Sequence, residues 1–181
     1  DYGDLKSDIV RLVAAFTAGS IDEFILTLSN ELTPGTYHRY VSADTQVLGM
    51  VLAKATGKNM TQYLQEKLWS QLGAEYDAEW MTDTEGTEIV LAGLIATLRD
   101  WARFGLLYLN KGRNFKGQQL VSESWVNASV TPDAPHLMPG RNNPNSRSPE
   151  GYGYQWWIPE TPDGDFVAQG IYGQFIYVSP K

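Results

Sequence analysis

A change of pattern near residue 130 constrains the fold more than any other feature of this sequence. Before it, apolar residues recur at the three- and four-residue spacing of amphipathic helices, and capping residues or glycines separate the segments. Residues 131–150 hold five of the nine prolines and show hardly any periodicity. Residues 151–181 are aromatic and β-prone. The pattern predicts helices first, then a long surface loop of the kind that often forms a lid, then strands.

The helical part carries clear start and stop signals. Ser20 and Glu23 form a capping box, and the apolar spacing that follows predicts a helix over residues 21–30. A helix that starts near Asp44 and ends at Gly57 is also predicted. We expect its apolar stripe to face the core; the stripe consists of Val47, Leu48, Val51, Leu52 and Ala55. Further helices are expected over residues 8–18, 59–72 and 97–110 and around Trp125, and an extended segment over 78–82.

Residues 152–158, 166–174 and 175–178 have the composition of strands. Trp156 and Trp157 would point to opposite faces of a strand, so one is expected in the core and the other in the wall of a pocket. We expect the remaining strands of this sheet outside the sequence and interpret both ends as cut, because stable proteins rarely leave a raw sheet edge.

The composition indicates a globular protein and argues against several functions. Of 181 residues, 43% are hydrophobic and 19% charged, and the net charge is −7. An acidic chain is a poor partner for nucleic acid, and no apolar run is long enough to span a membrane. With no cysteine and only His38 and His136, a multi-histidine metal site is not expected, nor is any cofactor. Compartment and oligomeric state stay open, with a periplasmic or secreted location favoured over the cytoplasm.

Tyr40 and Ser42 are the most suggestive pair for chemistry. They lie two positions apart on the approach to the helix near Asp44, so their side chains point the same way if this stretch is extended. A phenol and a hydroxyl aimed together at a helix entrance can form a small proton-handling site. In the alternative interpretation, the tyrosine packs on the helix and the serine caps it. The residues alone leave both interpretations open.

Five segments carry a family resemblance. The stretch Tyr40-Val41-Ser42, with the Leu-Gly-Met-Val-Leu and Ala-Thr-Gly that follow, resembles the second motif of the serine β-lactamase/penicillin-binding-protein superfamily. The likeness is to its class C-like branch, which includes esterases and nylon-oligomer (6-aminohexanoate-dimer) hydrolases. Four more segments resemble the nylon-oligomer hydrolase group in the same order: residues 1–8 (with Leu5 in place of a proline), 99–105, 155–157 and 170–174.

The resemblance implies an α+β fold of the β-lactamase/transpeptidase type, in which a helical subdomain accompanies an antiparallel sheet flanked by helices. Residues 1–150, with the long loop at 131–150, would then belong mostly to the helical subdomain. Residues 151–181 would be strands that return to the sheet, and only a central portion of the fold would be present.

The resemblance also implies a serine hydrolase that cleaves carboxyl esters or amides through an acyl-enzyme. Its nucleophile would come from a Ser-x-x-Lys motif, which this sequence does not contain. Tyr40 falls on the proton-shuttling tyrosine and Ser42 on a residue that hydrogen-bonds the motif's lysine. Ile171 falls where a backbone N–H forms half of the oxyanion hole. The positions implied to bind substrate are Tyr2, Trp157, Gly170, Tyr172 and Gly173.

Two departures from the family pattern narrow the expected substrate. Ala168 and Gln169 replace the Lys and Thr that hold the carboxylate of a β-lactam, which argues against β-lactamase activity. Val13 and Leu91 replace the Asp and Asn of nylon-active enzymes, so a small-molecule carboxyl ester or amide is the expected substrate. Two alternatives stay open: a non-catalytic ligand-binding protein on the same scaffold, and a D-amino-acid peptidase or penicillin-binding protein.

Overall fold

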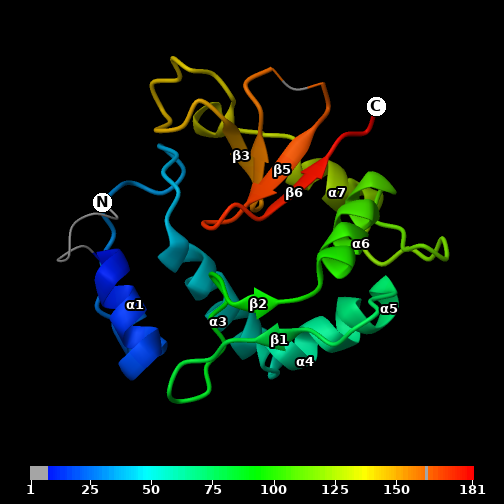
Figure 1. Cartoon of the computed structure of the whole chain (residues 1–181). Helices are drawn as coiled ribbons and strands as arrows, with labels where there is room; N and C mark the ends of the chain where they lie inside the picture. The colour runs from blue at the N-terminus through cyan, green and yellow to red at the C-terminus, as the bar shows by residue number, and fades with distance from the viewer. Residues whose placement is uncertain (1–7, 162) are drawn as a thin grey trace. The chain divides into compact units, whose positions relative to one another are not determined.

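In the computed structural model, residues 8–161 and 163–181 are described, and the chain forms two compact units made of alternating segments (Figure 1). Unit 1 comprises the chain up to Asn30 and residues 41–67 and 76–96. Unit 2 comprises residues 31–40, 68–75 and 97–181. Both mix helices with antiparallel strands, as the predicted fold class requires. In the described part of the chain, no helix has the length and apolar character needed to traverse a bilayer.

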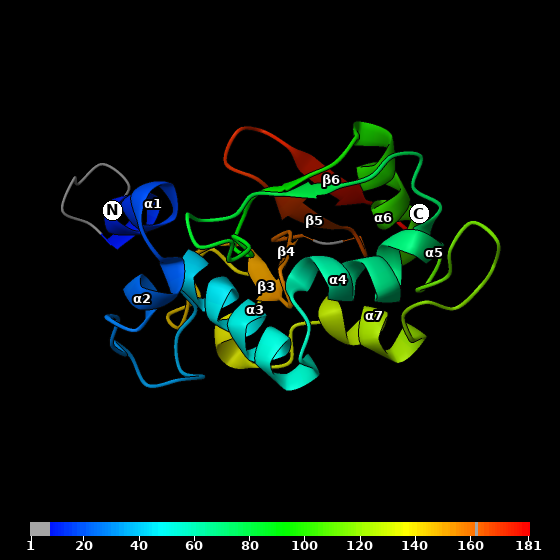
Figure 2. The ribbon, with the colours of Figure 1, turned by 90° about the horizontal axis from the view of Figure 1, so that it is seen from below.

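Unit 1 begins with α1 (Asp8–Ala18) and α2 (Ile21–Ile25), which lie side by side (Figure 2). Ser20 caps α2 as predicted, because its hydroxyl accepts a hydrogen bond from the Glu23 N–H. The predicted extent of this helix, residues 21–30, is wrong. The N–H groups of Thr27 and Leu28 bond to carbonyls three residues back, which tightens and ends the helix. The core of unit 1 consists of Leu12, Ile21, Phe24, Ile25 and Ile89.

Helix α3 (Ser42–Thr56) ends at Gly57 as predicted, but it buries a different face. Gln46 is buried, and its amide donates to the Glu88 carbonyl at 2.9 Å and accepts from the Val90 N–H at 2.7 Å. Gly49 lies so close to Val90 that a Cβ there would come within 2.6 Å of it. The buried glutamine satisfies backbone groups that no apolar residue could satisfy. The predicted core stripe is therefore wrong for Val47, Leu48, Val51 and Ala55, which are exposed, and Leu52 is only half-buried.

The predicted helix over residues 59–72 is interrupted. Asn59 caps α4 (Met60–Leu64) as expected, but a π-helical turn at Gln65–Trp69 separates it from α5 (Ser70–Leu72). In unit 1, the extended segment predicted over 78–82 is the two-residue strand β1 (Glu79–Trp80), which pairs antiparallel with β2 (Leu94–Ile95).

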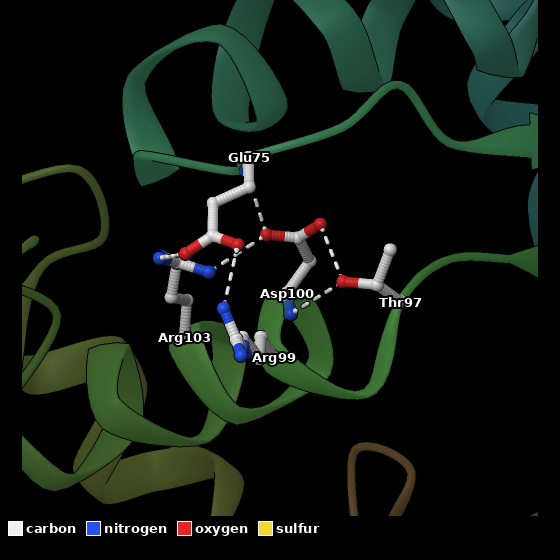
Figure 3. A network of polar contacts seen from close by, with 5 residues as sticks. All are labelled: Glu75, Thr97, Arg99, Asp100 and Arg103. Carbon is white, nitrogen blue, oxygen red and sulfur yellow. Dashed lines mark hydrogen bonds and ion pairs between the residues drawn. The ribbon is translucent and has the colours of Figure 1, made fainter.

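Unit 2 contains α6 (Leu98–Leu109), α7 (Glu123–Ser129) and a 3₁₀ turn at Pro135–Leu137. Thr97 and Ser122 cap α6 and α7 as predicted, each accepting from the N–H three residues on. A polar network joins the first turns of α6 to Glu75, which lies in the segment that follows α5 (Figure 3). At its centre the fully buried Asp100 carboxylate accepts from the Glu75 N–H at 2.8 Å and the Arg103 guanidinium at 2.9 Å.

The four strands of unit 2 form one antiparallel sheet in chain order. They are β3 (Gly151–Gly153), β4 (Trp156–Ile158), β5 (Phe166–Gln169) and β6 (Phe175–Val178). The single strand predicted over 152–158 is wrong: it is a tight hairpin, in which Tyr154 and Gln155 take left-handed φ angles of 42° and 77°. The strand predicted over 166–174 stops at Gln169, because residues 170–173 turn back into β6.

The sheet has two faces of different character. We call one the helix-covered face; it carries Trp156, Ile158, Phe166 and Val178, which pack against Phe104 and Tyr108 of α6. Helix α6 lies beside β6 (Figure 1), where Gly105 allows Ile176 to approach. We call the other the Tyr40 face; it carries Tyr152, Trp157 and Val167, which are neighbours across β3, β4 and β5. Trp156 is only 3% exposed, so the prediction that one of the two tryptophans lies in the core is confirmed. The role of Trp157 in the wall of a pocket stays a prediction.

Candidate active site

The segment that carries Tyr40 is held in unit 2 by the long loop. The His38 N–H donates to the Asn145 carbonyl at 2.8 Å, and the His38 carbonyl accepts from the Arg147 N–H at 3.0 Å. This parallel bridge brings the His38 ring beside Ser146, with Nδ1 3.1 Å from the serine hydroxyl. Residues 145–147 of the loop are thus bonded to the backbone two residues before Tyr40.

Four rings from three segments meet on the Tyr40 face. The Tyr40 ring lies 5.5 Å from that of Trp157 and 6.0 Å from that of Tyr152. His38 stacks on Tyr152, with ring centroids 5.1 Å apart and planes inclined by 24°. Tyr40 is 42% exposed, so its phenol is accessible from outside the protein while one side of its ring is packed. The structure therefore brings the predicted catalytic Tyr40 and the predicted wall residue Trp157 together.

Two polar groups of this cluster, Tyr152 and His38, are neutral near pH 7. Burial raises the pKa of the Tyr152 phenol far above its usual range, and the neighbouring Tyr40 adds to the effect. Tyr152 accordingly stays protonated and donates to the Gln155 amide oxygen at 3.1 Å. Burial also lowers the pKa of His38, with His136 contributing in the same direction. Any phenolate at Tyr40 would therefore need a cation from outside this cluster to stabilise it.

Ser42 is the first residue of α3, and the N-cap is Val41, so the interpretation of Ser42 as the helix cap is wrong. Val41 is extended, with φ −133° and ψ 109°, which is the condition under which Tyr40 and Ser42 are expected to point the same way. Tyr40 belongs to unit 2 and Ser42 to unit 1. Tyr2 lies outside the described residues.

The turn between β5 and β6 holds the other predicted site residues. The Gly170 N–H donates to the Gln174 carbonyl at 2.9 Å, and the Gly173 N–H to the Gly170 carbonyl at 3.2 Å. The Tyr172 N–H donates to the side-chain oxygen of Gln174 at 3.0 Å. Within residues 8–161 and 163–181, nothing accepts a hydrogen bond from the Ile171 N–H. Ile171 is 75% exposed, so this N–H lies on an accessible turn.

Sequence reasoning missed Tyr152 and Glu150. Tyr152 faces Trp157 across a hairpin whose turn contains no glycine or asparagine, so no turn signal revealed the pairing. The Gln169 amide donates to both carboxylate oxygens of Glu150, at 3.1 and 3.4 Å. A carboxylate therefore lies next to the position where the family resemblance implies a threonine. Over the described ranges, no three His, Asp or Glu side chains gather as metal ligands would.

Comparison with protein families decides the classification. The family model described as "Beta-lactamase" matches residues 3–181, nearly the whole chain. The chain belongs to the beta-lactamase family. This family is the one that the five sequence segments resemble, so the predicted resemblance is confirmed.

Within the beta-lactamase family, the chain is similar to 6-aminohexanoate-dimer hydrolases. It is 32% identical over 160 residues to the 6-aminohexanoate-dimer hydrolase of Paenarthrobacter ureafaciens, covering 88% of this chain and 40% of that protein. A solved structure named "Putative 6-aminohexanoate-dimer hydrolase from Bacillus anthracis" superposes with a TM-score of 0.79 at 33% identity, covering 91% of this chain and 41% of that one. The chain thus spans about two fifths of the length of these relatives.

A more distant member of the same fold is the octameric penicillin-binding protein homologue of Pyrococcus abyssi. Its TM-score is 0.53 at 17% identity, over 89% of this chain and 37% of that one. At this identity the likeness concerns the fold alone. Together with the Bacillus anthracis structure it confirms the predicted β-lactamase/transpeptidase-like fold class.

Proposed function

We propose that the protein containing this chain is a serine hydrolase that cleaves small carboxyl esters or amides through an acyl-enzyme. Membership of the beta-lactamase family and the similarity to 6-aminohexanoate-dimer hydrolases support hydrolysis as the reaction class. We place the nucleophilic serine and its lysine in a Ser-x-x-Lys motif outside the sequence given. We also keep the prediction that residues 1–150 contribute mostly to the helical subdomain of the whole enzyme and residues 151–181 to its sheet.

One observation carries the proposal: the half-exposed Tyr40 phenol stands against Trp157 in an otherwise neutral ring cluster. A tyrosine with an ordinary pKa of about 10 is a weak base at neutral pH. A lysine ammonium at this cluster would stabilise the phenolate, because the surrounding rings screen its charge poorly and offer no competing cation. The wall formed by Trp157 and Tyr152 would at the same time exclude water from one side of the reacting groups.

The reaction follows from these roles. The serine oxygen attacks the carbonyl carbon while its proton passes to the Tyr40–lysine pair, and the Ile171 N–H stabilises the oxyanion that forms. The C–O or C–N bond of the substrate then breaks, and the leaving alcohol or amine takes up the proton. Water attacks the acyl-enzyme by the same route, which releases the acid and restores the serine. Ser42 would hydrogen-bond the lysine and keep it beside the phenol.

We assign the substrate wall to Trp157, Tyr2 and the turn residues Gly170, Tyr172 and Gly173. Trp157 is already placed beside Tyr40, and the exposed Tyr172 side chain stands next to Ile171 in the turn. Gln169 pairs with the Glu150 carboxylate, so an anionic group of a substrate would meet a negative charge at that position. These features support an uncharged ester or amide in preference to a β-lactam.

The test uses the full-length enzyme that contains this sequence. We expect a fluorophosphonate to label one serine, and the enzyme to hydrolyse an aryl ester with a burst of phenol release. Tyr40→Phe removes only the hydroxyl and should lower the acylation rate by about 10²–10⁴-fold, the usual contribution of a general base. Tyr37→Phe, the same change three residues earlier, serves as the matched control. Full acylation by the Tyr40→Phe enzyme, or an unlabelled wild type, would refute the proposed function.

A further inference from the structure

The turn between β5 and β6 has a three-residue loop, Ile171–Gly173, at its tip. Gly170 and Gln174 flank this loop, and Gln174 closes it. Gly173 takes a left-handed φ of 80°, as hairpin loops of this length require of their last residue. Gln174 makes two hydrogen bonds in this turn. Its carbonyl accepts from the N–H of Gly170, just before the loop, and its side-chain oxygen accepts from the Tyr172 N–H within the loop. One side chain therefore bonds a backbone group in the middle of the loop that precedes it.

The Gln174 side chain folds back against Gly170. A Cβ at Gly170 would lie 2.5 Å from both Cγ and Cδ of Gln174 and 2.7 Å from its Nε2. Only a glycine leaves room for this conformation. Ordering a glutamine side chain costs up to about 2 kcal/mol in rotamer entropy, so the folded-back conformation depends on its hydrogen bond and its contact with Gly170.

These bonds account for the N–H groups of the turn one by one. Those of Gly170, Tyr172 and Gly173 each have an acceptor. Of residues 170–173, Ile171 alone keeps an N–H that no described residue accepts. Without the Gln174 side chain, the Tyr172 N–H would lose its acceptor too, and the turn would have two adjacent donors to satisfy. A ligand or water could then draw the backbone toward either one.

We propose that Gln174 is a positioning residue for the oxyanion hole: its side chain engages the Tyr172 N–H and fixes the turn so that the Ile171 N–H is the donor offered to the substrate oxygen. This inference rests on the proposed function and adds to it a residue that never touches the substrate. Oxyanion donors act only within about 2.7–3.1 Å of the developing charge. A displacement of about 1 Å can cost on the order of a hundredfold in rate.

The experiment compares Gln174→Met, Gly170→Ala and the double variant in the full-length enzyme. Methionine matches glutamine in length but offers no amide oxygen, and an alanine Cβ at position 170 would displace the Gln174 side chain. We expect each single change to lower kcat per fluorophosphonate-titrated site by about 10- to 100-fold. In Gln174→Met, which leaves the residues of the substrate wall unchanged, KM should stay within about twofold. The double variant should lose no more than the worse single variant, because both changes disable the same hydrogen bond.

A boronic acid that forms an anionic tetrahedral adduct supplies a readout that a purely structural role would not change. Its affinity should fall by the same factor as kcat, since both depend on the oxyanion donor. Gln65→Met, on an exposed glutamine of unit 1, is the matched control and should leave both values unchanged. Unchanged kcat in Gln174→Met, additive losses in the double variant, or a lower kcat with unchanged boronate affinity would each overturn the inference.

The two proposals fail in distinguishable ways. If the wild type is labelled and depends on Tyr40 while the Gln174→Met enzyme matches it, only the positioning role is lost. If the wild type is neither labelled nor active on esters, the proposed function fails and the positioning role fails with it.

Discussion

Trp156 and Trp157 are the same residue one position apart, yet the structure uses them in opposite ways. Trp156 lies on the helix-covered face, 3% exposed, among Phe104, Tyr108 and Phe166. Trp157 lies on the Tyr40 face in a half-buried cluster with two phenols and an imidazole. The rings of the helix-covered face pack against one another and against α6, whereas the cluster on the Tyr40 face includes phenol and imidazole groups. One β-strand therefore separates the residues that stabilise unit 2 from those that we assign to catalysis.

Trp156→Ala tests the helix-covered face and should have the largest effect, a loss of unfolding free energy. Removal of a core tryptophan costs about 3–5 kcal/mol of unfolding free energy, and here it also opens the contacts with α6. Urea denaturation of the full-length enzyme, over the transition in which unit 2 unfolds, measures the loss of unfolding free energy. Trp157→Ala is the matched comparison and should cost clearly less; equal losses would show that the two faces do not differ as we describe.

Asp100→Ala tests the polar network that attaches α6, the helix packed on the helix-covered face. The change leaves the Arg103 guanidinium without its 2.9 Å partner and the Glu75 N–H without an acceptor, so we expect a loss of about 2–3 kcal/mol in stability. Arg99→Ala is the control, because Arg99 is largely exposed and reaches Glu75 only at 3.4 Å; it should cost about 0.5 kcal/mol or less. Rates measured well below the melting temperature should be unaffected in both variants.

Trp157→Phe tests the Tyr40 face and should change the kinetics while changing the stability little, the opposite of what we expect for Trp156→Ala. A phenylalanine keeps part of the wall beside Tyr40, so the stability should change by about 1 kcal/mol or less. The smaller ring leaves a gap where we place the substrate, and KM for an aryl ester should rise several-fold while kcat changes little. A stability loss as large as that of Trp156→Ala, with an unchanged KM, would assign Trp157 to the core instead.

The smallest predicted effect is a pH dependence on the Tyr40 face. Because burial lowers the pKa of His38 below its usual 6.5, the unfolded chain binds a proton that the folded chain does not as the pH falls below 6.5. The contribution of neutral His38 is therefore fully present above pH 6.5 and is lost on acidification toward its folded-state pKa. His38→Gln should remove this part of the stability–pH slope, whereas His136→Gln should leave most of it. An unchanged slope between pH 6.5 and 5 in His38→Gln would contradict the assignment.

The sequence predicted those elements that local chemistry determines. Ser20, Asn59, Thr97 and Ser122 cap helices where their side chains implied, and Gly57 ends α3. The class of fold also followed, because the family motifs recur in a fixed order along the chain. For the caps and the helix end, a few neighbouring residues contain the whole physical cause.

The failures come from contacts between residues far apart in sequence. The buried face of α3 is set by the hydrogen bonds of Gln46 to residues 88–91, which outweigh the apolar stripe of the helix. The bond between the long loop and His38 joins residues more than a hundred positions apart. In the candidate site, Tyr40 and Trp157 could be named from the motifs, but their contact depends on a hairpin without a turn signal. Ile171 could be named as a donor, whereas the role of Gln174 needed the folded turn.

The hairpin at Tyr154 and Gln155 has an evolutionary consequence. Because side chains alternate along a strand, a slip of β4 by one residue against β3 and β5 would exchange the two tryptophans between the faces and disrupt both at once. Selection should therefore act on the register of β4 more than on the identity of the two turn residues. New substrate preferences in this lineage would then arise by exchange of single side chains around Trp157.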